Sequence, residues 1–67
     1  MIPITVNDEP RQVAEGVTIA ELLGELGLAG KPVAVEVNLQ LVPQQRHAQE
    51  RLAAGDAVEI VTLVGGG

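Results

Sequence analysis

The chain has 67 residues and contains neither cysteine nor an aromatic residue, which limits what can hold a fold together. Disulfides, thiolate zinc sites, iron–sulfur clusters and cysteine nucleophiles are all excluded. A chain of this length has room for one domain and buries only about 60% of the surface that its unfolded form exposes. The core must therefore be aliphatic, and apolar residues make up 46% of the sequence. We expect a single domain over residues 1–67.

The charge balance removes several classes of partner. Nine acidic and four basic side chains give a formal net charge of −5. With no basic cluster and no aromatic stacking residue, nucleic-acid binding is not expected, and an anionic membrane surface would repel the chain. No apolar run approaches the roughly 20 residues of a membrane span, and the N-terminus has no signal-peptide core. We expect a cytoplasmic protein that binds neither nucleic acid nor membrane.

The clearest local signal is a helix start. Thr18 and Glu21 have the spacing of a capping box, in which each side chain bonds the other residue's backbone N–H. Gly27 is suited to a left-handed helix stop. Between them one apolar stripe follows at helical spacing and predicts an amphipathic helix over residues 19–26; its members are Ile19, Leu22, Leu23 and Leu26.

Alternating apolar residues predict strands around this helix. The pattern places them at residues 2–6, 11–14, 33–38 and 57–64, with a short strand within 39–43 and one or two irregular helical turns within 44–54. Pro3 should lie at a strand start or an unpaired position. In the last strand, Val58 and Ile60 should point inward, and Glu59, Val61 and Leu63 outward.

The order strand, strand, helix, strand, short strand, strand predicts a two-layer α+β fold. We expect a mixed sheet of four to five strands packed on one main helix, with residues 65–67 as a flexible, projecting tail. By analogy with known topology this is the β-grasp arrangement of ubiquitin.

Side chains suited to catalysis or metal binding are sparse. His47 is the sole histidine and has no serine or second histidine at a suggestive spacing, so we expect it on the surface or at a rim. The acidic residues are expected on solvated faces. The sequence thus predicts no catalytic residue, no metal site, no bound cofactor and no enzymatic activity.

The glycine triplet Gly65, Gly66 and Gly67 has two interpretations. It is either a frayed end or a slim tail that threads a narrow channel in a partner. Extended, three residues reach about 10 Å and present the carboxylate of Gly67. A carboxylate is a poor electrophile until ATP-dependent adenylation supplies a leaving group, after which a sulfur or nitrogen nucleophile can attack it.

Six segments have residues and an order typical of one known family: ITVND (4–8), TIAELL (18–23), VAVEVN (33–38), LVP (41–43), GDAVEIV (55–61) and VGGG (64–67). They are spread over essentially the whole chain, and by them the sequence resembles the ThiS family, the ubiquitin-like sulfur carriers of the thiamine pathway. Two departures are visible. Leu39-Gln40 stands where the family commonly has a glycine-containing turn, and residues 44–48 do not have the arginine and tryptophan often found after the proline, because their own arginine, Arg46, stands three positions beyond Pro43.

The resemblance implies a carrier that partners load and unload. A ThiF-like enzyme would adenylate Gly67 with ATP and magnesium, a persulfide donor would convert it to a thiocarboxylate, and thiazole synthase would take the sulfur. Gly65 and Gly66 would thread the partner's active site. An apolar docking strip would lie beside the tail, although outward aliphatics are also common on ordinary sheet faces; it comprises Val61, Leu63 and Val64.

Three alternatives remain open from the sequence. The small subunit of molybdopterin synthase shares the fold and the Gly-Gly end, but is typically longer, with aromatic residues before the tail. A protein-modifying tag would form isopeptide bonds through Gly67. A plain interaction module would carry the tail incidentally.

Overall fold

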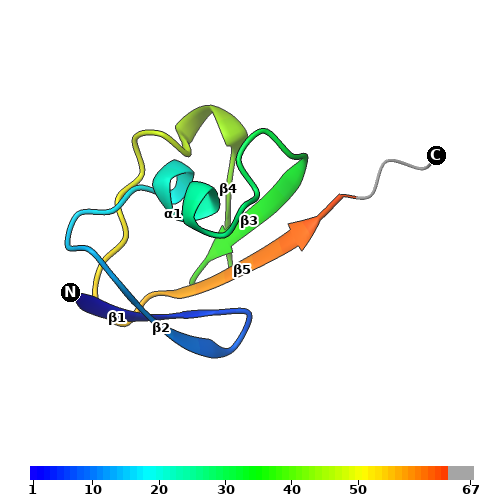
Figure 1. Ribbon diagram of the computed structural model, residues 1–67. Coiled ribbons are helices and arrows are strands. Elements are labelled where there is room, and N and C mark those ends of the chain that lie inside the picture. The colour runs from blue at the N-terminus through cyan, green and yellow to red at the C-terminus, as the bar shows by residue number, and fades with distance from the viewer. Residues whose placement is uncertain (64–67) are drawn as a thin grey trace.

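Five strands and one α-helix are arranged as two layers in the computed structural model, which describes residues 1–63. The predicted tail, residues 65–67, and Val64 lie outside the described residues. In chain order the elements are β1 (Ile2–Val6), β2 (Glu9–Val13), α1 (Ile19–Glu25), β3 (Val33–Val37), β4 (Gln40–Val42), the 3-10 helix η1 (Gln44–Arg46) and β5 (Ala57–Thr62). Figure 1 shows α1 on one side of the sheet, with the segment after β4 passing on the same side.

The sheet is mixed and has the strand order β2-β1-β5-β3-β4. The last strand is central: β5 runs parallel to β1 and antiparallel to β3. Both outer pairs, β1 with β2 and β3 with β4, are antiparallel hairpins. The predicted mixed sheet on one helix is confirmed, with five strands, and the strand that leads toward the tail lies at its centre.

The second strand of the first hairpin starts earlier than the sequence pattern predicts. We expected the second strand over 11–14, but β2 begins at Glu9, because Asn7 and Asp8 alone form the turn. Their φ angles of 51° and 68° identify a two-residue type I′ turn. Pro10 is tolerated inside β2 because it stands opposite Thr5 in a pair whose backbone groups point away from each other.

The start of α1 uses every backbone donor of its first turn. The capping box is present: the Thr18 hydroxyl accepts the N–H of Glu21 at 3.1 Å, and the Glu21 carboxylate accepts the N–H of Thr18 at 2.9 Å. The N–H groups of Ile19 and Ala20 donate to the carbonyls of residues 50 and 47, at 3.0 and 2.9 Å. The segment after β4 therefore fixes the position of the helix start.

Acid should weaken this cap. Hydrogen bonds from the backbone N–H and then the hydroxyl of Thr18 hold the pKa of Glu21 below its ordinary value of 4.5. A lowered folded-state pKa stabilises the protein above pH 4.5, and this contribution is lost as the pH falls through the folded-state value. The free energy of unfolding of wild type and of Glu21→Gln should be measured against pH. The difference in favour of the wild type should become smaller in acid. Two parallel curves would contradict this role.

The core lies between α1 and the inner face of the sheet. Ile19, Leu22, Val13, Val35 and Val58 are fully buried, so each layer contributes to it. The helix stripe and the inward sides of the strands predicted from alternation are confirmed. The complete set of buried apolar residues is Ile4, Val13, Val17, Ile19, Leu22, Leu23, Val35, Val42, Leu52, Val58 and Ile60.

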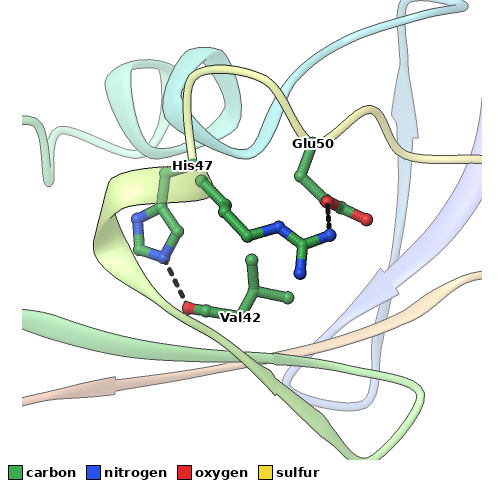
Figure 2. A network of polar contacts seen from close by, with 4 residues as sticks. Val42, His47 and Glu50 are labelled. Atoms are coloured by element: carbon green, nitrogen blue, oxygen red, sulfur yellow. Dashed lines mark hydrogen bonds and ion pairs between the residues drawn. The ribbon is translucent and has the colours of Figure 1, made fainter.

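His47 is buried, so its expected surface or rim position is wrong. The side chain follows η1 and is 6% exposed. Its Nε2 lies 3.0 Å from the carbonyl oxygen of Val42, which can only accept, so the ring donates this bond. Figure 2 shows this contact beside Glu50. The Glu50 carboxylate pairs with the guanidinium of Arg46 at 2.7 Å. His47 thus joins the segment after β4 to the strand before it, and the same residue's carbonyl holds the helix start.

The turn between β3 and β4 carries backbone strain. Asn38 and Leu39 have φ angles of 52° and 68°, and leucine rarely adopts the second of these. Leu39 is 84% exposed, so its side chain buries little. Replacing Leu39 with glycine should raise the free energy of unfolding by about 1 kcal/mol, measured by urea denaturation. As a control, Leu41→Gly lies within β4 and should lower it; the same sign for both variants would contradict the strain.

Candidate functional site

The end of β5 presents aliphatic side chains on the sheet face opposite the helix. Val58 and Ile60 point into the core, whereas Val61 and Leu63 are 60% and 52% exposed. Leu63 donates its N–H to the carbonyl of Pro32 at 2.9 Å, so pairing with the β3 side continues one residue beyond the strand. The last described residues of the chain are therefore held in an extended path that leads away from the sheet (Figure 1).

Two neighbouring strands extend this outer face. Ala34 of β3 stands opposite Val61, and Leu41 of β4, 67% exposed, stands opposite Glu36. Glu36 in turn stands opposite Glu59, which places two carboxylates side by side. Neither forms an ion pair within residues 1–63. Like charges in this position destabilise a sheet, and a basic group from a partner would offset the repulsion.

Asn7 fixes the path of β5 where β1 ends. Its side-chain oxygen accepts the N–H of Ile60 at 2.8 Å, and its amide nitrogen donates to the carbonyl of Ile60 at 3.2 Å. The chain turns into the hairpin after Val6, so the backbone of β1 can no longer pair with Ile60. The Asn7 side chain takes its place in the parallel ladder between β1 and β5. Asn7 and Ile60 lie 53 positions apart in the sequence, so no local pattern points to this role.

The structure describes some of the predicted site residues and not others. Val61 within β5 and Leu63 just after its end are both exposed, as expected from alternation. Val64, Gly65, Gly66 and Gly67 lie outside the described residues. Leu41 was not among the predicted docking residues; its exposure follows from pairing in β4, which is too short for alternation to reveal.

Chemical groups that could act on a substrate are scarce in the described part of the chain. Residues 1–63 contain no group of three or more histidine, aspartate or glutamate side chains that could hold a metal ion. The sole histidine is committed to Val42. Within the same range, no helix has the length and apolar character needed to cross a membrane. The exposed end of β5 is therefore the candidate site.

Comparisons with known proteins agree on one family. The ThiS family profile matches residues 4–67. The sulfur carrier protein ThiS of Escherichia coli is 34% identical over 64 residues, which cover 96% of this chain and 97% of that protein. A crystal structure of the thiamine biosynthesis protein ThiS from Geobacter metallireducens has a TM-score of 0.83 and 35% identity, covering 98% of this chain and 100% of that one. This likeness confirms the β-grasp arrangement.

A longer relative contains a similar segment. The thiazole synthase of Paramagnetospirillum magneticum is 44% identical over 64 residues, which are 96% of this chain but only 20% of that protein. The chain thus spans about a fifth of that relative.

Proposed function

Because the chain belongs to the ThiS family, we propose that it carries sulfur for the thiazole moiety of thiamine on the carboxylate of Gly67. The chain is a sulfur carrier in thiamine biosynthesis and not a catalyst. The observation that supports Gly67 as the carrying residue is the exposed end of β5, which is followed in the sequence by Leu63, Val64 and three glycines. The molybdopterin-synthase and protein-tag alternatives have no comparable support.

The proposed loading proceeds in two steps. A ThiF-like enzyme uses ATP and magnesium to join the Gly67 carboxylate to AMP, releasing pyrophosphate. A persulfide sulfur then attacks the acyl carbon, AMP leaves, and reductive cleavage of the resulting sulfur–sulfur bond by a thiol gives the thiocarboxylate. The chain itself binds no cofactor in this proposal, and Gly65 and Gly66 let the carboxylate pass into the enzyme's active site because they lack a Cβ. We place this loading in the cytoplasm.

Thiazole synthase is the proposed receiver of the sulfur. Support comes from relatives named thiazole synthase that contain a segment similar to this chain. The test of the whole proposal is intact mass after incubation with a ThiF-like enzyme, ATP, magnesium and a persulfide donor. We expect the mass change of one oxygen replaced by sulfur at the C-terminus, and transfer of that sulfur when thiazole synthase is added. An unchanged mass would refute the carrier site.

Charge placed in the docking strip should weaken binding. Val61 is 60% exposed on the outer face, so Val61→Asp removes little buried apolar area from the fold, but it replaces an apolar contact with a carboxylate that binding would have to desolvate. We expect about a tenfold higher Kd for thiazole synthase in a calorimetric titration. Thr5→Asp, on the same face but in β1, is the matched control and should bind nearly as the wild type does. Equal affinity of Val61→Asp and wild type would remove Val61 from the interface.

A further inference from the structure

Alternate residues of β5 direct their backbone N–H and carbonyl groups to opposite edges of the strand. Toward β3, Leu63 donates its N–H to the carbonyl of Pro32 at 2.9 Å, and the carbonyl of Ala57 accepts the N–H of Asn38 at 2.8 Å. Because backbone groups alternate along a strand, residues 57, 59, 61 and 63 face β3, and residues 58, 60 and 62 face the opposite edge.

On that opposite edge, the hydrogen bonds that β5 forms with β1 and Asn7 end at Ile60, before the last residue of β5. The carbonyl of Val58 accepts the N–H of Asn7 at 2.8 Å, and the Asn7 side chain bonds both backbone groups of Ile60. Strand β1 ends at Val6, and the chain then turns away into the hairpin. The N–H and carbonyl of Thr62 therefore face this edge with no partner among residues 1–63.

A cleft of about 470 Å³ lies beside this free edge. Its walls come from the first hairpin, the C-terminal end of α1 and β5, and Pro10, Leu26 and Ile60 give it an apolar lining. Arg11 is the one basic residue in the wall. Its Nη2 lies 3.4 Å from Glu25 Oε1, which is long for a hydrogen bond, and its Nε is buried without a partner within the described range. The side chain is 37% exposed and Nη1 forms no hydrogen bond within residues 1–63, so the two Nη groups retain donors for a carboxylate.

We propose that this cleft receives an extended segment of the protein that takes the tail. The segment adds to β5 as a strand at Thr62 and places an acidic side chain on Arg11. Backbone pairing with an exposed edge, together with pockets for side chains, is a common mode of peptide recognition. The outer edge of β2 is less suitable, because Pro10 lacks a donor there.

This inference rests on the proposed function. Threading of residues 65–67 into an active site brings the surface of the receiving protein against the end of β5. Thr62 is the last residue of that strand, so its N–H and carbonyl are the strand's backbone groups nearest to the surface of the receiving protein.

Calorimetric titration with purified thiazole synthase tests the proposal. Thr62→Pro removes the free N–H without breaking a hydrogen bond within residues 1–63, and should weaken binding about tenfold. Arg11→Gln should weaken it by about the same factor and reduce its salt dependence. The matched controls are Gln12→Pro, at the outer edge of β2, and Arg46→Gln, outside the cleft; both should stay within about twofold of wild type. Thermal melting checks that each variant is folded.

Amide hydrogen exchange gives a second readout. The N–H of Thr62 should exchange rapidly in the isolated chain and slowly in the complex. Unchanged exchange on binding, or wild-type affinity of a folded Thr62→Pro variant, would overturn strand addition while leaving the proposed function intact if the chain still acquires sulfur. Protection that grows with the concentration of the chain alone would assign the edge to a second copy and equally overturn the proposal. Failure of sulfur loading would instead refute the proposed function.

Discussion

Removal of Gly67 should slow sulfur loading by at least roughly 10²-fold while leaving the fold unchanged. Deleting this residue moves the terminal carboxylate back by about 3.5 Å along an extended chain. Displacement of a reacting group by even about 1 Å can lower a rate by roughly 10²-fold, so loading should fall by at least that factor. The measurement is the rate of the oxygen-for-sulfur mass change with a ThiF-like enzyme, ATP and a persulfide donor.

Two further variants separate position from bulk. Gly67→Ala keeps the carboxylate in register and adds only a methyl group, so it should load more slowly than wild type but faster than the deletion. Deletion of Met1, which is 81% exposed, shortens the chain equally at the other end and should load normally. Undiminished loading of the chain that lacks Gly67 would show that sulfur is not carried at this position.

Local and periodic signals were sufficient to predict most of the fold. The Thr18–Glu21 capping box specifies the helix start through contacts only three residues apart, and alternation in residues 57–62 separates inward Val58 from outward Val61. These features depend only on residues that are close together in the sequence, so a single sequence reveals them. The candidate site was accessible for the same reason: it lies where a patterned strand runs into glycines.

Contacts that depend on the tertiary arrangement could not be predicted in this way. His47 follows a short 3-10 helix without periodicity, and its burial depends on where the carbonyl of Val42 lies. Asn7 bonds Ile60 only because β1 ends beside β5. The start of β2 at Glu9 was missed because Pro10 is normally unfavourable in a strand, and only the register shows that its nitrogen faces outward.

Truncation of Leu22 to alanine should have the largest effect on folding. Leu22 is fully buried at the centre of the helix stripe, where its side chain packs between α1 and the sheet. Leu→Ala at a buried site costs about 2–5 kcal/mol, and a domain of this length has a total stability of roughly 3–10 kcal/mol. Thermal unfolding followed by circular dichroism should therefore show a Tm lowered by roughly 10–25 °C.

Leu41 provides the matched control, because it carries the same side chain on the outer face and is 67% exposed. Leu41→Ala should change the free energy of unfolding by no more than about 0.5 kcal/mol. Sulfur loading below the Tm should be retained in folded Leu22→Ala, since the carrying group is a main-chain carboxylate and not a core side chain. If Leu22→Ala and Leu41→Ala melted alike, the helix would not be held on the sheet by this residue, and the position of β5 would need another explanation.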